Sequence, residues 1–270
     1  MKGLPGKSRG RGPWLEAGHL LGAGVKLVFT DRHGGVSEPP FHWLNLAYHT
    51  GDDPRRVAAN RAILASALGM EEELVAYPEQ VHGVRVAWVS SRTRGAARFD
   101  AGTLRQTDGV LGRERGLTLA VLTADCVPIA LHYPGYGVIA MLHAGWRGTI
   151  GDIVGAACRT IEADAGLCPS IARAVLGPSI GPCCYAVDEG RARLFVEKYG
   201  EDSGVVTRER GYAVDLRKAN RMNMLGCGMR AENLFEVGGC TCCDPDYYSF
   251  RRDGITGRQG AFLRLDEEGG

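Results

Sequence analysis

Apolar residues recur along the chain with the periods typical of strands and helices. Two long apolar stretches, 117–131 and 137–142, have the composition of strands that are buried on both faces. The first of them is interrupted by Asp125 and Cys126. Shorter apolar or alternating segments predict further strands at 25–30, 84–89, 174–176, 234–237 and 261–265.

Helical spacing of apolar residues predicts four helices. The clearest begins after Asp53, an N-cap in front of Pro54, and ends at Gly69. The others are expected at 149–165, 189–199 and 216–226. Strands and helices interleave to the end of the chain without a linker or an internal repeat. We therefore expect a mixed α/β (α+β) fold with one domain at 25–266, preceded by a mobile lead at 1–24 whose first 13 residues are rich in glycine, proline and basic residues.

The composition excludes several classes of protein. The chain has 270 residues, 44% hydrophobic and 23% charged, which is typical of a globular protein. Its 32 basic and 31 acidic residues leave a formal charge of +1, so we expect neither a nucleic-acid nor a membrane partner. No apolar run approaches a membrane span, and no signal peptide is recognisable. The nine cysteines are odd in number, which favours thiols or metal ligands in a reduced, cytoplasmic protein.

Polar motifs stand at the ends of three apolar strands, and they contain His82, Cys126 and His143. Three protein ligands with an open fourth position are typical of catalytic zinc sites, and the spacing of these residues matches no zinc finger. The same residues also fit a thiol enzyme, with Cys126 as nucleophile, His143 as base and Asp125 nearby. Spacing alone leaves both alternatives open.

The other cysteines and the arginines give weaker signals. Cys240 and Cys243 form a Cys-x-x-Cys pair, but no second pair stands at zinc-ribbon distance. Adjacent cysteines such as those at 183–184 are not expected to reach one ion, so small buried thiols are the expectation for these residues. Arginines beside glycine turns suit a phosphate or a carboxylate, and the candidates are Arg32, Arg147 and Arg252. The chain has no P-loop, GxGxxG or HExxH motif.

These motifs resemble those of the YfiH family, also called multicopper polyphenol oxidase or laccase-domain proteins, whose members are described as purine nucleoside phosphorylases. The most specific matches are Ala-Asp-Cys-Val-Pro-Ile at 124–129 and His-Ala-Gly-Trp-Arg-Gly at 143–148. The resemblance covers about residues 25–265, with further matching positions at 30–37, 44–46, 51–54, 60–61, 80–82, 177–181, 184–185, 215–216, 220, 240–241, 249–252 and 257–258. One departure is Ala186, where the family commonly has a glutamate.

The resemblance implies a four-layer α/β/β/α sandwich and one zinc ion held by His82, Cys126 and His143. Copper is the alternative metal. It also implies phosphorolysis of adenosine, inosine and methylthioadenosine to the free base and a ribose 1-phosphate, with adenosine deamination as a second activity. Purine nucleosides and phosphate are the expected partners, and the protein is expected as a monomer or a homodimer. Within this interpretation Asp125 is the catalytic carboxylate, and the substrate or phosphate contacts are assigned to Arg32, Asn45, Gln80, Arg147 and Arg252.

Other functions stay open at this stage. Some relatives are described as peptidoglycan editing factors, which would make the protein a hydrolase of UDP-muramoyl-L-serine. A copper-dependent polyphenol oxidase is less favoured, because seven histidines with only two well placed cannot build a cluster of several coppers. A partner-binding or metal-sensing domain without enzymatic activity is the third alternative.

Overall fold

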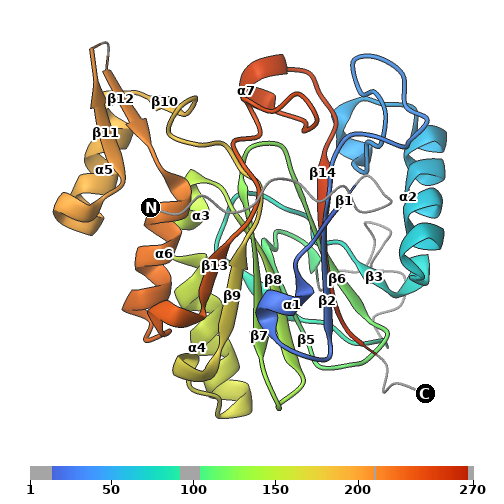
Figure 1. The fold of residues 1–270 in the computed structure, drawn as a ribbon, viewed down its shortest axis with the longest axis horizontal. Coiled ribbons are helices and arrows are strands. Elements are labelled where there is room, and N and C mark those ends of the chain that lie inside the picture. The colour runs from blue at the N-terminus through green and yellow to red at the C-terminus, as the bar shows by residue number, and fades with distance from the viewer. Residues whose placement is uncertain (1–13, 92–103, 210, 267–270) are drawn as a thin grey trace.

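The computed structural model describes residues 14–91, 104–209 and 211–266. Two sheets lie at its centre (Figure 1). The five-stranded sheet has the order β1-β2-β14-β6-β3, with β1 (Trp14–Glu16), β2 (Val25–Thr30), β3 (Val75–Ala76), β6 (Thr118–Thr123) and β14 (Gln259–Leu265). The six-stranded sheet has the order β13-β9-β7-β8-β5-β4, with β4 (Val86–Trp88), β5 (Gly109–Gly112), β7 (Val127–Tyr133), β8 (Val138–Ala144), β9 (Arg173–Leu176) and β13 (Leu234–Glu236).

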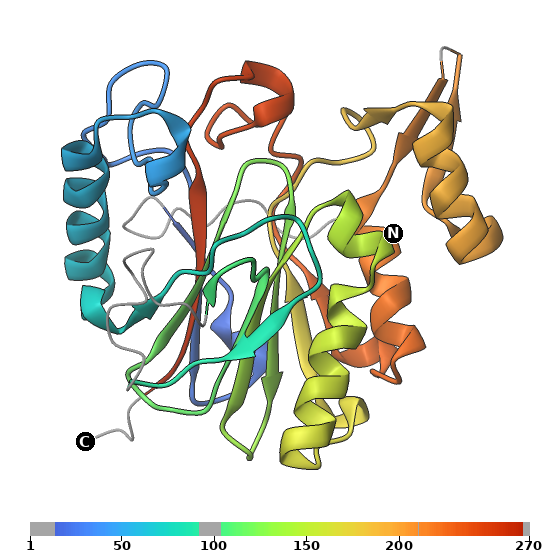
Figure 2. The ribbon, with the colours of Figure 1, turned by 180° about the vertical axis from the view of Figure 1, so that it is seen from behind.

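Helices cover the outer faces of both sheets (Figures 1 and 2). The described helices are α1 (Gly18–Leu21), α2 (Pro54–Leu68), α3 (Trp146–Ile150), α4 (Ile153–Ala165), α5 (Glu189–Tyr199), α6 (Leu216–Gly226) and α7 (Phe250–Asp253). A small sheet of β10 (Ala186–Val187), β12 (Gly211–Val214) and β11 (Val205–Arg208) packs with α5. Both views show this unit projecting from one upper corner of the molecule.

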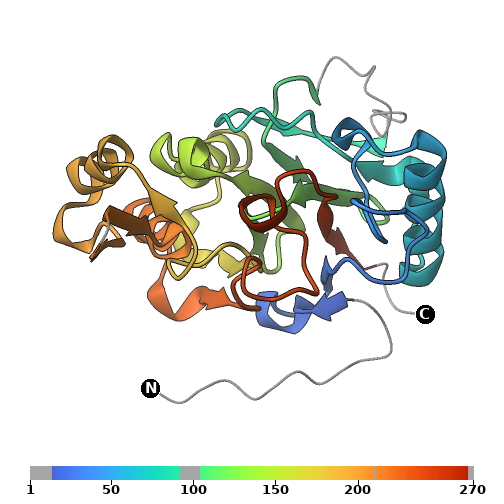
Figure 3. The same ribbon diagram turned by 90° about the horizontal axis from the view of Figure 1, so that it is seen from above.

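Three clusters of buried apolar side chains define the layers. The first packs α2 on the five-stranded sheet through Leu64 and Leu68. The second fills the space between the sheets, with Phe29 from β2 and Met141 from β8. The third packs α4 and α6 on the outer face of the six-stranded sheet. The mixed α/β fold is therefore confirmed, with its layers in the order helix, sheet, sheet, helix (Figure 3).

Most predicted elements are confirmed, and β2, α5 and α6 have the expected bounds. The apolar stretch 117–131 is not one strand, however, because the chain leaves the five-stranded sheet after Thr123 and enters the six-stranded sheet at Val127. The helix expected at 149–165 is two helices, since Asp152 caps α4 by accepting the N–H of Gly155 at 2.9 Å. The strand expected at 84–89 is shortened to β4.

The expectation of a mobile lead over residues 1–24 is wrong for its second half. The segment 14–16 forms β1, which pairs antiparallel with β2. In and beside α1, Ala17 and Leu21 are fully buried against the inter-sheet cluster. Apolar residues in a short segment can thus complete a sheet edge even where no periodic pattern predicts an element. Residues 1–13 lie outside the described part of the chain.

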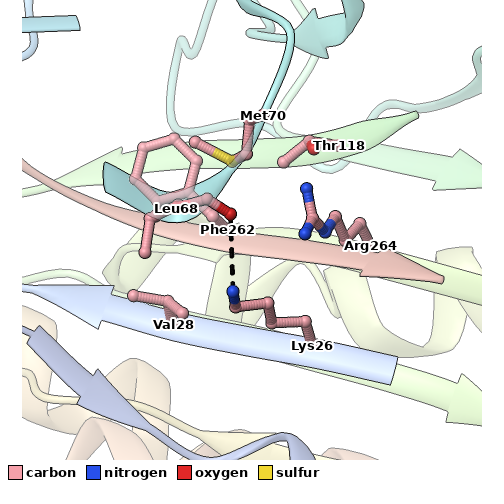
Figure 4. A pocket seen from close by; sticks show the side chains of 7 residues that line it. All are labelled: Lys26, Val28, Leu68, Met70, Thr118, Phe262 and Arg264. Atoms are coloured by element: carbon pink, nitrogen blue, oxygen red, sulfur yellow. Dashed lines mark hydrogen bonds between the residues drawn. The ribbon is translucent and has the colours of Figure 1, made fainter. Parts of the chain in front are cut away.

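The carboxyl end of α2 is fixed to the five-stranded sheet at a small hollow (Figure 4). Lys26 Nζ donates to the carbonyl of Leu68 at 3.4 Å, and Arg264 Nη1 donates to that of Gly69 at 2.6 Å. Cations at this end of a helix bond the carbonyls that have no partner within the helix and complement the helix dipole. The hollow therefore serves to attach α2 and lies on the opposite face of the sheet from the inter-sheet core.

Gly177, directly after β9, shows how closely the sheets approach. A Cβ at this position would overlap the ring of Phe29, which is 2% exposed and cannot move aside. We expect Gly177→Ala to lower the free energy of unfolding by about 1–3 kcal/mol, as overpacking does. Urea denaturation is the measurement. The matched control is Gly226→Ala, where a Cβ meets nothing within 4 Å. Equal midpoints for the two variants would contradict this account of the sheet packing.

Candidate metal centre

His82, Cys126 and His143 meet at one end of the two sheets. Cys126 immediately precedes β7 and His143 is the penultimate residue of β8, so the pairing of Val127 with Ala144 places them side by side. His82 comes from the loop between β3 and β4. One ligand atom from each of the three residues lies within 4.8 Å of the others. Residues 44 and 17 positions apart in the sequence therefore form a set that can hold a metal ion.

A buried aspartate, Asp108, organises these ligands from behind. Its side chain is fully buried, and Oδ1 accepts a hydrogen bond from His143 Nδ1 at 2.8 Å. The carboxylate also accepts the backbone N–H groups of Val81, His82 and Gly83 at 3.2, 2.9 and 2.7 Å. A carboxylate bonded to one ring nitrogen fixes the orientation of a metal-binding histidine and leaves the other nitrogen, here Nε2, for the metal. Asp108 thus positions both histidines.

The electrostatics of the centre favour a thiolate. Burial opposes ionisation of Cys126, but His143 and hydrogen bonds from both histidines lower the pKa of its thiol to about 6. Burial likewise opposes the charge on His143, but the Cys126 thiolate and Asp108 raise the pKa of its ring to about 9. The two groups therefore favour each other's charged forms, the thiolate of Cys126 and the protonated ring of His143. A thiolate and two imidazoles are typical zinc ligands, so the residues fit the metal that the sequence indicates.

The backbone around the centre is closely packed and partly strained. His82 and Asp125 have φ of 63° and 93°, in the left-handed region that non-glycine residues rarely occupy. Gly145 follows β8, and a Cβ there would lie 2.9 Å from His82 Cδ2 and 3.0 Å from Cys126 Sγ. Strained conformations cluster at functional sites, where the surrounding structure holds them in place.

Asp125 lies next to Cys126 where the chain crosses between the sheets. Its Oδ1 accepts the hydroxyl of Thr241 and its Oδ2 accepts the backbone N–H of Arg251, both at 2.7 Å. Its carbonyl accepts the N–H of Ile180 at 2.9 Å. Asp125 therefore connects two turns and α7 to the segment between β6 and β7. Seen from above, α7 lies over the central sheets (Figure 3). Its role in proton transfer stays a prediction.

Gln80 and Asn45 have amides that the protein itself uses. The Gln80 amide forms two hydrogen bonds with the backbone of Leu122, both at 2.8 Å, which dock the His82 loop on β6. Asn45 is fully buried, and its Oδ1 accepts the N–H groups of Ala47 and Arg258. In this arrangement both side chains position neighbouring segments, and their assignment as substrate contacts stays a prediction.

The three predicted arginines have different surroundings. Arg32 Nε donates to the carbonyl of His42 at 2.9 Å, and Arg252 donates to carbonyls along the turn 241–247. Both guanidinium groups therefore hold loops together. Arg147 is exposed, with its guanidinium 4.6 Å from the ring centre of Trp146. Contact of any of the three with phosphate stays a prediction.

A family model described as multi-copper polyphenol oxidoreductase laccase matches residues 26–266. The chain belongs to this family. A relative from Geobacillus stearothermophilus named "Purine nucleoside phosphorylase YlmD" is 38% identical over 261 residues, covering 94% of this chain and 95% of the relative. A purine nucleoside phosphorylase of Deinococcus radiodurans is 41% identical, covering 96% and 95%.

Solved structures of laccase-family members have the same fold. The crystal structure of YlmD from Geobacillus stearothermophilus superposes with a TM-score of 0.90 at 36% identity, covering 97% of this chain and 98% of that one. The Bacillus licheniformis hypothetical protein YfiH gives 0.85 at 34% identity, covering 90% and 93%. In the described part of this family member, no helix has both the length and the apolar character needed to cross a bilayer.

Two residues beside this centre, Asp108 and Arg258, were not predicted from the sequence. Asp108 stands directly before β5, and only its position at a strand end gave a signal. Arg258 follows Gly257, the same glycine–arginine signal that selected other arginines, and its Nη1 donates to two backbone carbonyls at 2.9 Å. Burial lowers the pKa of Arg258, while Cys126 and Asp125 act in the opposite direction. Its guanidinium therefore lies close enough to interact with both groups.

Replacing Asp108 tests its role as the organiser of the ligands. An Asp108→Asn side chain keeps one acceptor oxygen for four donors, so we expect the affinity for zinc to fall about 10- to 100-fold. Competition with a chromophoric chelator measures the change. Asp164→Asn is the matched control, because Asp164 accepts the indole N–H of the distant Trp88. Unchanged zinc affinity in Asp108→Asn would show that the histidines hold their positions without it.

Proposed function

We propose that the protein is a zinc-dependent purine nucleoside phosphorylase. The observation that carries the proposal is the set of His82, Cys126 and His143 backed by Asp108, with the half-buried guanidinium of Arg258 close enough to interact with Cys126. The names of the relatives, which match nearly the whole chain, support the same reaction. Imidazole and thiolate ligands suit zinc, although copper binds such sites tightly when it is available. Copper-dependent phenol oxidation, the less favoured alternative from the sequence, is not proposed as the main activity.

In phosphorolysis, a phosphate oxygen forms a bond to C1′ of the ribose as the bond from C1′ to the purine nitrogen breaks. The bonding electrons pass to the purine, which takes up a proton. When bound, zinc supplies Lewis-acid stabilisation of negative charge on an oxygen atom. We assign Arg258 to the phosphate, because a guanidinium binds phosphate oxygens strongly where water is excluded. The Asp125 carboxylate is held rigidly by Thr241 and Arg251, which suits it to orient substrate or to accept a proton.

Adenosine deamination is a second reaction that the same centre suits. The observation that favours it is a carboxylate, Asp125, adjacent in sequence to the thiolate ligand Cys126 and 8% exposed. In zinc deaminases a carboxylate that does not bind the metal transfers the proton to the leaving ammonia. We assign that transfer to Asp125. Its oxygens each keep a second lone pair beyond the hydrogen bond that they accept.

The first experiment is a product assay with zinc-loaded protein. We expect adenosine, inosine or methylthioadenosine to release the free base only when phosphate is present. Cys126→Ala should lose both zinc and turnover, because it removes one of three ligands. The matched control is Cys168→Ala, an exposed cysteine in the turn after α4. A Cys126→Ala protein that keeps zinc and turnover would refute the centre. If the zinc-loaded protein converts none of the nucleosides, the proposed phosphorylase activity is refuted, and hydrolysis of the cell-wall precursor is favoured.

A second experiment tests whether Arg258 or Arg147 binds the phosphate. Arg258→Gln should raise the KM for phosphate about 10-fold or more and change the KM for nucleoside less, since a charge-assisted hydrogen bond contributes about 1.5–3 kcal/mol. Arg147→Gln is the comparison, because Arg147 is exposed and lies over Trp146. Zinc content and thermal unfolding show whether each variant is intact. If Arg147→Gln alone raises the KM for phosphate, the assignment passes to Arg147.

A further inference from the structure

Four cysteines converge at a place separate from His82, Cys126 and His143. The first two, Cys183 and Cys184, lie in the turn that follows β9, and the other two, Cys240 and Cys243, lie in the turn between β13 and α7. One Sγ atom from each lies within 4.8 Å of the others. Adjacent cysteines were not expected to reach one ion. Here the sulfurs of both lie close to those of the other two cysteines, in a tight turn in which Cys184 and the next residue both bond to the carbonyl of Gly181.

The spacing of the sulfur atoms fits ligands around one ion. The Sγ of Cys243 lies 3.5 Å from that of Cys183 and 3.3 Å from that of Cys184. Zinc–sulfur bonds of about 2.3 Å in a tetrahedron place the sulfurs about 3.8 Å apart, whereas a disulfide bond is about 2.05 Å long. We propose that Cys183, Cys184, Cys240 and Cys243 hold a second Zn²⁺ ion. Four protein ligands close the coordination sphere, so this site is structural and not catalytic.

Backbone N–H groups prepare one sulfur for this role. Gly181 N donates to the Sγ of Cys240 at 3.1 Å, and the N–H groups of Cys242 and Cys243 also bond to it. These hydrogen bonds stabilise negative charge on the sulfur of Cys240, the form in which a cysteine binds a metal. Zinc binding would release the protons that remain on the four thiols to solvent.

Two arginines complement the charge of such a site. Four thiolates and one Zn²⁺ ion carry a net charge of −2. Arg208 donates to the carbonyl of Pro182, next to Cys183, and Arg252 Nη1 donates to the carbonyls of Thr241 and Cys242 at 3.0 and 3.2 Å. Both cations are thus fixed to the two turns that carry the ligands. Their positive charges lower the electrostatic repulsion among four thiolates held close together.

The proposed zinc would hold together two turns that lie beside the catalytic centre. The turns that carry the ligands are otherwise joined by the bridge between Ser179 and Cys240 and by a 3.1 Å hydrogen bond from Thr241 N to the carbonyl of Ser179. The hydroxyl of Thr241 bonds to Asp125 beside Cys126. An ion that joins both turns therefore holds the segment that positions Asp125. It acts on the catalytic centre without touching substrate.

Metal stoichiometry tests the proposal directly. The protein is prepared under reducing conditions, stripped by a chelator, and reloaded with zinc. We expect two equivalents in the wild type, one in Cys126→Ala, one in the double variant Cys240→Ser with Cys243→Ser, and two in the control Cys168→Ser. In Cys126→Ala loaded with Co²⁺, the remaining ion should show the intense sulfur-to-cobalt charge transfer of four thiolates. This spectrum does not depend on catalytic activity.

A second measurement uses the wild type alone, so that a folding defect in a variant cannot decide the outcome. Zinc should protect Cys183, Cys184, Cys240 and Cys243 from alkylation, as read by mass spectrometry of labelled peptides, and the chelator should expose them. One equivalent of zinc in the reduced wild type, with these four cysteines alkylated at the same rate with and without zinc, would overturn the second site. Loss of catalysis with both zinc ions retained would refute only the proposed function.

Discussion

The carboxylate of Asp108 is the constraint on which the candidate centre depends. It is fully buried, and its charge is stabilised by three backbone N–H groups and by the ring of His143. Burying an unpaired carboxylate is costly, so the loop 81–83 must stay where it can donate these hydrogen bonds. His82 then has to adopt a positive φ, and Gly145 has to lack a side chain. The metal geometry therefore follows from the satisfaction of one buried charge.

The sheet architecture supplies the other half of the arrangement. Residues of β8 alternate between the outer cluster and the inter-sheet cluster, and His143 has the parity of Ile139 and Met141, which face the opposite sheet. The segment 124–126, where the chain passes from β6 to β7, brings Cys126 to the same end of the sheets as His143. The two sheets therefore present a cysteine and a histidine at one end of their shared core. Arg32 and Arg252, which the sequence suggested as phosphate contacts, hold loops over this end, whereas Arg258, which it did not suggest, interacts with Cys126.

The sequence predicted the elements with strong periodicity or clear caps, such as α2, α5 and α6, because these signals are local. It also singled out His82, Cys126 and His143 as candidate metal ligands, since three polar motifs at the ends of apolar strands together indicate a shared site, and the structure brings these residues together. It failed where the outcome depended on tertiary contacts. An apolar run gives no sign of which sheet each half joins, so β6 and β7 appeared as one strand. Asp108 and the four-cysteine cluster were missed because their partners are distant in the sequence.

The crossing between β6 and β7 also limits how the chain can vary in length. Only residues 124–126 separate the last residue of one strand from the first residue of the other. Because successive side chains of a strand face opposite sides, one inserted residue that shifted the pairing of β7 would turn its outward-facing apolar set toward the other sheet. The same insertion would move Cys126 away from His143. The position of a candidate metal ligand and the packing of the core therefore depend on the same three residues, and a change of length there that shifted the pairing of β7 would lose both at once.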